Sequence, residues 1–145
     1  LLVEDNPGDV ELTKRNLAES AFNLNINVVE DGEEAIAYLR REGDYANAPR
    51  PDLILLDLKM PKMGGYEVID ALKADPALHD VEIMVLTSAS GQMSKLLQRG
   101  FPTSRYVRKP IRVDRFDQVV AEVKEVEVPV EEKPKRPWWW PFGTR

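Results

Sequence analysis

The chain has 145 residues, 43% hydrophobic and 31% charged, a balance typical of one soluble domain with a sizeable core. It contains no cysteine and a single histidine, so disulfides, thiolate chemistry and multi-histidine metal sites are excluded. The net charge of −5 argues against nucleic acid as a partner, and no apolar run approaches the ~20 residues that a membrane-spanning helix needs.

The first apolar run, Leu1–Val3, predicts a strand, and the residues behind it predict a helix. Asparagine suits the position before a helix, and proline suits the first turn, where its missing N–H costs nothing. Asn6 and Pro7 stand in this order, and apolar residues follow at helical spacing. The sequence therefore predicts a first helix that runs to about Phe22.

A second strand–helix pair follows in the same pattern. Ile26–Val29 predicts the strand. Asp31 and Glu34, three residues apart, form a capping-box pattern that predicts the start of the second helix. The polar segment 43–51 contains two prolines and predicts a loop.

Asp52 and Asp57 enclose four apolar residues at the middle of the chain. A short unbroken apolar run is typical of a strand that is buried on both faces of a parallel sheet. Pro61 stands soon after Asp57 and ends strand pairing. Asp57 is therefore expected at the carboxyl end of a central strand, where open α/β sheets bind their ligands. The alternative is that Asp57 only caps the following turn.

The second half of the chain predicts a third helix and then two more strand–helix pairs. In chain order these are a helix that follows Gly64 and Gly65 and is stopped by Asp75 and Pro76, a strand Val81–Leu86, a helix with Met93, Leu96 and Leu97 that stops at Gly100, a short strand with Tyr106 and Val107, and a helix marked by Phe116, Val119, Val120 and Val123. Five alternating pairs require parallel strands, right-handed crossovers and helices on both faces. We therefore predict an α/β doubly wound, flavodoxin-like fold with a five-stranded parallel sheet of order 2-1-3-4-5.

The composition changes at Val126, which predicts a domain over 1–125 and a tail over 126–145. Four prolines and mixed charges predict an extended, poorly ordered tail. All three tryptophans of the chain stand at 138–140, followed by Phe142. Two uses of the tail remain open. It packs onto its own domain or a second copy, or it docks on a partner protein or a membrane interface.

Polar residues collect at four of the five predicted strand ends, namely Glu4 with Asp5, Asp57, Thr87 and Lys109. In a doubly wound sheet these ends face one crevice. Neighbouring carboxylates repel each other unless a cation joins them, and Mg²⁺ suits such oxygen ligands. Asp57 can then attack a phosphoryl group, while Lys109 and Thr87 stabilise charge on the transferring oxygens. Taken singly, each residue also fits a polar loop, a helix cap or a surface charge.

In order and spacing, these pieces resemble a response-regulator receiver domain. The matching segments are 1–6 (LLVEDN), 55–61 (LLDLKMP), 85–89 (VLTSA) and 108–110 (RKP), and the resemblance covers residues 1 to about 124. The segment Asn6–Asp9 and the loop 43–51 are most similar to stand-alone regulators associated with phytochrome-type kinases.

The resemblance implies that Asp57 accepts a phosphoryl group from the phosphohistidine of a sensor histidine kinase. It also implies that the protein is not an enzyme for other substrates and catalyses only its own phosphorylation and dephosphorylation. It implies that Mg²⁺ binds Asp5, Asp57 and the backbone carbonyl of Lys59, with Glu4 contributing through water. It also implies that Lys109 pairs with the phosphoryl group, and it places the protein in the cytoplasm.

The resemblance further implies a switch that links phosphorylation to a protein-interaction face. Thr87 would bond the phosphate and move, Tyr106 would turn inward, and the Lys109–Pro110 bond would be cis. The fourth helix, fifth strand and fifth helix would then contact a downstream protein or a second copy of the chain. Residues 91–95 and 101–103 depart from the family pattern on this face.

Four competing interpretations are weaker. A flavodoxin-like redox domain needs a phosphate-cradling first loop, where Glu4 and Asp5 would repel phosphate. A dinucleotide-binding domain needs a glycine motif that the chain lacks. An aspartyl phosphatase needs a second acid where Lys59 stands. A degenerate receiver that docks without phosphorylation is opposed by the intact polar set. His79 is interpreted as a surface residue rather than a phosphorelay histidine.

Overall fold

The computed structural model describes residues 1–87, 92–101 and 105–129. Its five strands are β1 (Leu2–Val3), β2 (Val28–Val29), β3 (Ile54–Asp57), β4 (Ile83–Thr87) and β5 (Tyr106–Arg108). They form one sheet of order β2-β1-β3-β4-β5, in which every neighbouring pair is parallel. The predicted fold class and strand order are therefore confirmed.

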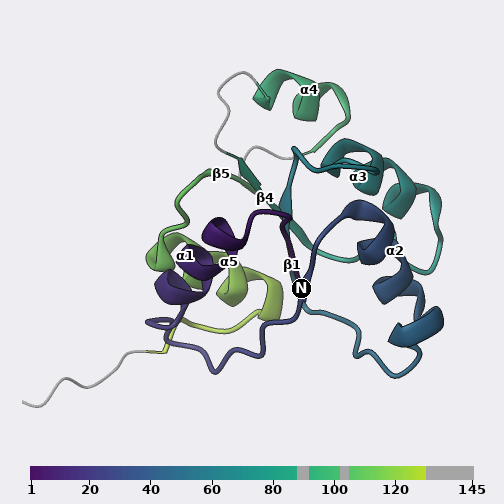
Figure 1. The fold of residues 1–145 in the computed structure, drawn as a ribbon. Helices are drawn as coiled ribbons and strands as arrows, with labels where there is room; N and C mark the ends of the chain where they lie inside the picture. Colours follow the sequence, from purple (N-terminus) through teal and green to yellow (C-terminus); the bar gives the residue numbers. More distant parts are fainter. Residues whose placement is uncertain (88–91, 102–104, 130–145) are drawn as a thin grey trace, which may run out of the picture.

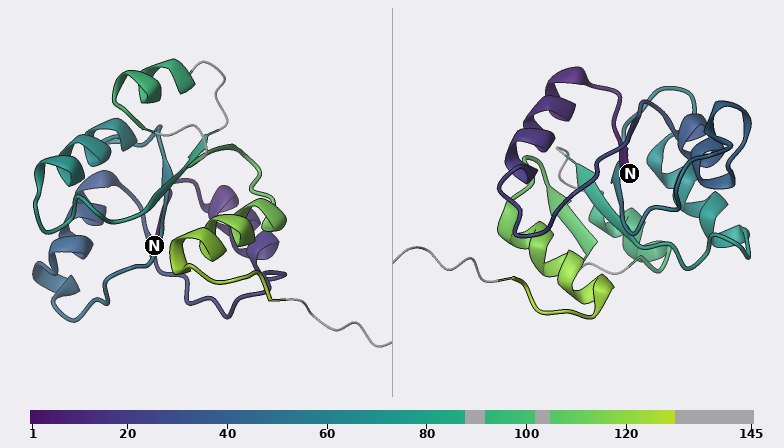
Figure 2. Two further views of the ribbon diagram at one scale, coloured as in Figure 1. Left: turned by 180° about the vertical axis from the view of Figure 1, so that it is seen from behind. Right: turned by 90° about the horizontal axis from the view of Figure 1, so that it is seen from below.

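The helices cover both faces of this sheet (Figures 1 and 2). They are α1 (Pro7–Leu17), α2 (Gly32–Arg40), α3 (Gly65–Ala74), α4 (Met93–Gln98) and α5 (Val113–Lys124), with a short 3-10 turn η1 (Gly43–Tyr45) after α2. α1 packs beside α5 on one face, and α2 packs beside α3 on the other. None of the described helices is long and apolar enough to cross a membrane.

Two apolar cores result from the alternation of side chains along the central strands. In β3, Ile54 and Leu56 pack toward α2 and α3, whereas Leu55 packs toward α1 and α5. All four residues of β3 are buried. This burial on both faces is the reason that the central run is continuously apolar.

The first helix is shorter than predicted, because it ends at Leu17 rather than near Phe22. Asp117 of α5 accepts hydrogen bonds from the Ser20 hydroxyl at 2.5 Å and from the Ala21 backbone N–H at 2.9 Å. The chain behind Leu17 is thus bound by a tertiary contact to α5 instead of continuing the helix. Helical spacing of apolar residues cannot show such a contact, since its partner is almost a hundred residues away.

The second helix begins as predicted, with one difference in its cap. The Asp31 carboxylate accepts from the backbone N–H of Glu34 at 2.8 Å, as a capping box requires. The Glu34 carboxylate, however, accepts from the N–H of Glu30 at 2.8 Å instead of that of Asp31. The predicted helix start is confirmed, and its cap extends one residue further back.

The other predicted helices are found with small shifts at their ends. α3 ends before Asp75, as predicted, and α4 ends at Gln98, shortly before Gly100. Within α4, Leu96 is buried and Leu97 is exposed. The tail beyond Pro129, with its tryptophans, lies outside the described residues, as do 88–91 and 102–104.

Candidate functional site

The candidate site lies at the carboxyl ends of β1, β3, β4 and β5, where polar residues stand. Glu4 follows β1, Asp57 is the last residue of β3, Thr87 is the last residue of β4, and Lys109 follows β5. The side chains of Glu4, Asp57 and Thr87 are almost fully buried, whereas Asp5 is exposed. The backbone N–H of Lys109 donates to the Thr87 carbonyl at 2.8 Å, which joins the ends of β4 and β5.

Glu4, Asp5 and Asp57 form a carboxylate cluster. One carboxylate oxygen from each lies within 4.8 Å of the other two. Burial and the neighbouring Asp57 carboxylate raise the pKa of Glu4 to about 8, although Lys109 offsets part of this rise. A divalent cation would relieve the same repulsion, and an all-oxygen donor set is the kind that Mg²⁺ and Mn²⁺ prefer. The residues present therefore fit such an ion.

The Lys109 ammonium lies at the centre of the polar residues. Its Nζ is 3.0 and 3.1 Å from the two carboxylate oxygens of Glu4, 2.9 Å from Asp9 Oδ2 and 3.3 Å from Asp57 Oδ2. Burial lowers the pKa of Lys109, but the hydrogen bonds to Asp9 and Glu4 and the charge of Asp57 outweigh burial, so the pKa is raised overall. The amine is therefore protonated throughout the physiological range.

Asp9 also belongs to this network, although the sequence predicts for it only a position at the start of the first helix. It lies in the first turn of α1, where its N–H donates to the Asn6 side-chain oxygen at 3.1 Å. The hydrogen bond from Lys109 is the main reason that the pKa of Asp9 is lowered. The sequence does show a further acid about one helical turn after the Glu4–Asp5 pair, and this spacing could have pointed to the site. Acids are also common in the first turn of ordinary helices, so the spacing alone did not assign Asp9 to it.

The remaining predicted residues lie around Asp57 and the last strand. The backbone N–H of Lys59 donates to Asp57 Oδ1 at 3.3 Å, so the start of this loop contacts the carboxylate. Tyr106, at the start of β5, is half-buried. The Lys109–Pro110 bond is cis, as the resemblance implied. His79 is exposed in the loop after α3, consistent with a surface residue.

Two glycines beside the site allow segments of the backbone to pack closely against each other, a role that the sequence did not indicate. A Cβ atom on Gly65 would lie 2.5 Å from the Asp57 carbonyl oxygen and 2.7 Å from Leu58 Cα. A Cβ atom on Gly32 would lie 2.4 Å from the Met63 carbonyl oxygen. Real Cβ atoms do not tolerate such distances, so α2 and α3 reach the Asp57 loop only because these positions lack side chains.

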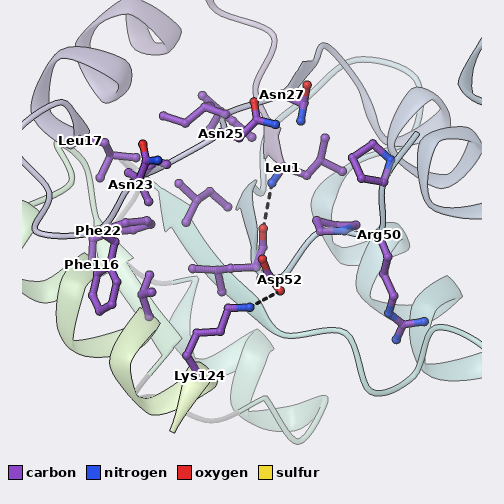
Figure 3. Close-up of a pocket in the computed structure, with 18 of the residues that line it drawn as sticks. Leu1, Leu17, Phe22, Asn23, Asn25, Asn27, Arg50, Asp52, Phe116 and Lys124 are labelled. Carbon is purple, nitrogen blue, oxygen red and sulfur yellow. Dashed lines mark hydrogen bonds and ion pairs between the residues drawn. The ribbon is translucent and has the colours of Figure 1, made fainter. Parts of the chain in front are cut away.

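A separate hollow of about 350 Å³ lies at the opposite edge of the sheet, around the start of β1 and β3 (Figure 3). At its rim Lys124 Nζ is 2.7 Å from Asp52 Oδ1, and the Leu1 amino group donates to the Leu53 carbonyl at 2.9 Å. Its lining is largely apolar and contains none of the predicted site residues. This hollow is therefore separate from the polar cluster around Asp57.

The response regulator receiver domain family matches residues 1–121 of the chain. The chain belongs to this family. As a receiver domain it is a component of two-component signalling, in which receivers interact with histidine kinases. The membership accounts for the strand order and for the polar residues at the strand ends.

Three response regulators are similar to this receiver domain in sequence or in structure. Response regulator Rcp1 of Synechocystis sp. is 40% identical over 92 residues, which cover 63% of this chain and 63% of that protein. The structure of Mn²⁺-bound Rcp1 matches with a TM-score of 0.68 at 30% identity, over 89% of this chain and 96% of that one.

The other two are phytochrome response regulators. The phosphorylated cyanobacterial regulator RcpA matches with a TM-score of 0.67 at 40% identity, over 86% of this chain and 89% of that one. The bacteriophytochrome regulator AtBRR matches with a TM-score of 0.78 at 32% identity, over 91% and 95%. The predicted similarity of this receiver to phytochrome-associated regulators is thereby confirmed.

Proposed function

We propose that this receiver domain accepts a phosphoryl group on Asp57 from the phosphohistidine of a sensor histidine kinase, in a step that depends on Mg²⁺. The observation that carries the proposal is the position of the Lys109 ammonium, 3.3 Å from Asp57 Oδ2 and beside the carboxylate cluster. A protonated amine at this distance stabilises negative charge that develops on oxygens bonded to Asp57.

In the proposed reaction a carboxylate oxygen of Asp57 attacks phosphorus while the bond from phosphorus to the imidazole nitrogen breaks. The imidazole leaves with the bonding electron pair, and Asp57 becomes an acyl phosphate. Lys109 and the Thr87 hydroxyl are the groups that would bond the transferred oxygens. Asp5, Asp57 and the Lys59 carbonyl would hold Mg²⁺, with Glu4 acting through water, and the ion would neutralise phosphoryl charge.

The relatives support the chemistry and the type of partner. RcpA is described as phosphorylated and Rcp1 as bound to Mn²⁺, and RcpA and AtBRR are regulators of phytochrome systems. A phytochrome-type kinase is therefore the proposed phosphate source for this chain. The domain would catalyse only its own phosphorylation and dephosphorylation. The alternative, docking without phosphorylation, predicts no reaction with any phosphodonor.

Mg²⁺ is expected to stabilise the unmodified protein and to be required for its phosphorylation. At ten times its dissociation constant, an ion that binds only the folded state adds about 1.4 kcal/mol to the free energy of unfolding. The melting temperature should therefore rise by a few degrees in Mg²⁺, and less in Asp5→Ala. Intact-mass measurement with acetyl phosphate should show one added phosphoryl group in Mg²⁺ and none in EDTA. Phosphorylation in EDTA would contradict the proposed metal dependence.

The face formed by α4, β5 and α5 is the proposed output surface, with a downstream protein or a second copy as its partner. The tail is proposed to act separately from phosphorylation, because its aromatic residues lie outside the four matching motifs. Deletion of residues 127–145 should leave phosphorylation of Asp57 unchanged and alter self-association, partner capture or vesicle binding. Analytical sedimentation and vesicle co-flotation of both proteins would measure this. Loss of phosphorylation in a folded truncated protein would show that the tail contributes to the active site.

A further inference from the structure

Among the carboxylates that the structure describes, Asp9 is the one partner of the Lys109 ammonium that stands outside the carboxylate cluster. Its Oδ2 lies 2.9 Å from Lys109 Nζ, closer than the described oxygens of Glu4 at 3.0 and 3.1 Å and of Asp57 at 3.3 Å. The other two carboxylates that Lys109 contacts, Glu4 and Asp57, both belong to the cluster that fits a divalent cation. Lys109 is thus shared between the proposed metal site and a carboxylate beside it.

We propose that Asp9 is a positioning residue that holds Lys109 from outside the metal cluster and thereby keeps Glu4 and Asp57 available to the cation. This inference rests on the proposed function, since it presupposes the Mg²⁺ site. The ammonium has three N–H donors, and a carboxylate that occupies one of them reduces the demand of Lys109 on the oxygens of the cluster.

The structure holds Asp9 firmly enough for this role. Its backbone is fixed by the bond to the Asn6 side chain at the start of α1, and Thr13 and Leu17 anchor the same helix in the protein interior. The Asn16 side chain donates to the Ile111 carbonyl at 3.1 Å, two residues beyond Lys109. This bond ties α1 to the loop that carries Lys109 independently of the Asp9–Lys109 pair, which helps to fix Asp9 relative to Lys109.

Loss of the Asp9 charge should strengthen the pairing of Lys109 with the oxygens that the cation binds. In Asp9→Asn, Lys109 would pair only with Glu4 and Asp57, so Mg²⁺ and the ammonium would compete for the same oxygens. The Asp9 side chain is 40% exposed, and ion pairs of such exposure contribute up to about 1 kcal/mol, equivalent to about a fivefold change in a binding constant. We expect the dissociation constant for Mg²⁺ to rise about two- to fivefold.

The test is isothermal titration of Mg²⁺ into the full chain without a phosphodonor. Asp80→Asn is the matched control, because it also removes one carboxylate charge and one ion pair, that of Asp80 with Arg50 at 2.7 Å, but far from the site. Asp9→Asn should weaken Mg²⁺ binding, Asp80→Asn should not, and Asp9→Glu should restore part of the affinity. Wild-type affinity in Asp9→Asn would overturn the inference.

A double-mutant cycle with Lys109→Met separates an action through Lys109 from direct attraction between Asp9 and the ion. If Asp9 acts through Lys109, Asp9→Asn should weaken binding much less in the Lys109→Met background than in the wild type. Equal effects in both backgrounds would overturn the inference and leave the metal site intact. Absence of Mg²⁺ binding to the wild-type chain would instead refute the proposed metal site together with the inference.

Discussion

Asp57→Asn is expected to abolish uptake of a phosphoryl group from acetyl phosphate in the presence of Mg²⁺. The amide lacks the nucleophilic oxygen of the carboxylate and contributes no charge to the metal cluster, so both requirements of the proposed reaction fail together. The fold should survive, because Lys109 retains its contacts with Glu4 and Asp9. Intact-mass measurement should show one phosphoryl group on the wild type and none on the variant.

Asp52→Asn provides the matched control, since Asp52 stands at the other end of the same apolar run. Its side chain is 71% exposed and pairs with Lys124 at 2.7 Å on the opposite edge of the sheet. This variant should be phosphorylated as fast as the wild type. Equal labelling of Asp57→Asn and wild type would place the acceptor on another residue and refute the assignment of Asp57.

Gly65→Ala is expected to destabilise the fold and to slow phosphorylation together. The added methyl group would lie 2.5 Å from the Asp57 carbonyl oxygen and 2.7 Å from Leu58 Cα, and both of these are backbone atoms that cannot rotate away. Either α3 or the end of β3 must shift. Forced packing of this kind costs about 1–3 kcal/mol in the free energy of unfolding, which urea denaturation measures directly.

Gly64→Ser is the control for this prediction, because it adds a Cβ atom at the neighbouring position. There the nearest atom, the Leu58 carbonyl oxygen, is 3.5 Å away, an ordinary contact, and serine suits the position before a helix. This variant should retain the stability and the phosphorylation rate of the wild type. If Gly65→Ala proved as stable as Gly64→Ser, the close packing of α3 on Asp57 would not be a requirement of the fold.

The order of elements and the residue types at the strand ends could be predicted from local patterns in the chain. Hydrophobic periodicity is a local property, and five alternations of strand and helix allow few arrangements other than a parallel sheet with helices on both faces. The same alternation places Glu4, Asp57, Thr87 and Lys109 at one edge, since parallel strands all end on the same side. These inferences needed no knowledge of which side chains touch.

Which of these residues contact one another, and where the helices end, depends instead on long-range packing. Asp9 pairs with Lys109 across a hundred residues of chain, and Asp117 binds the segment that would otherwise continue the first helix. Gly65 matters because another backbone lies against it, which its own sequence neighbours do not reveal. Such contacts arise when distant segments pack together, and helix spacing or capping patterns carry information only about residues within a few turns of each other.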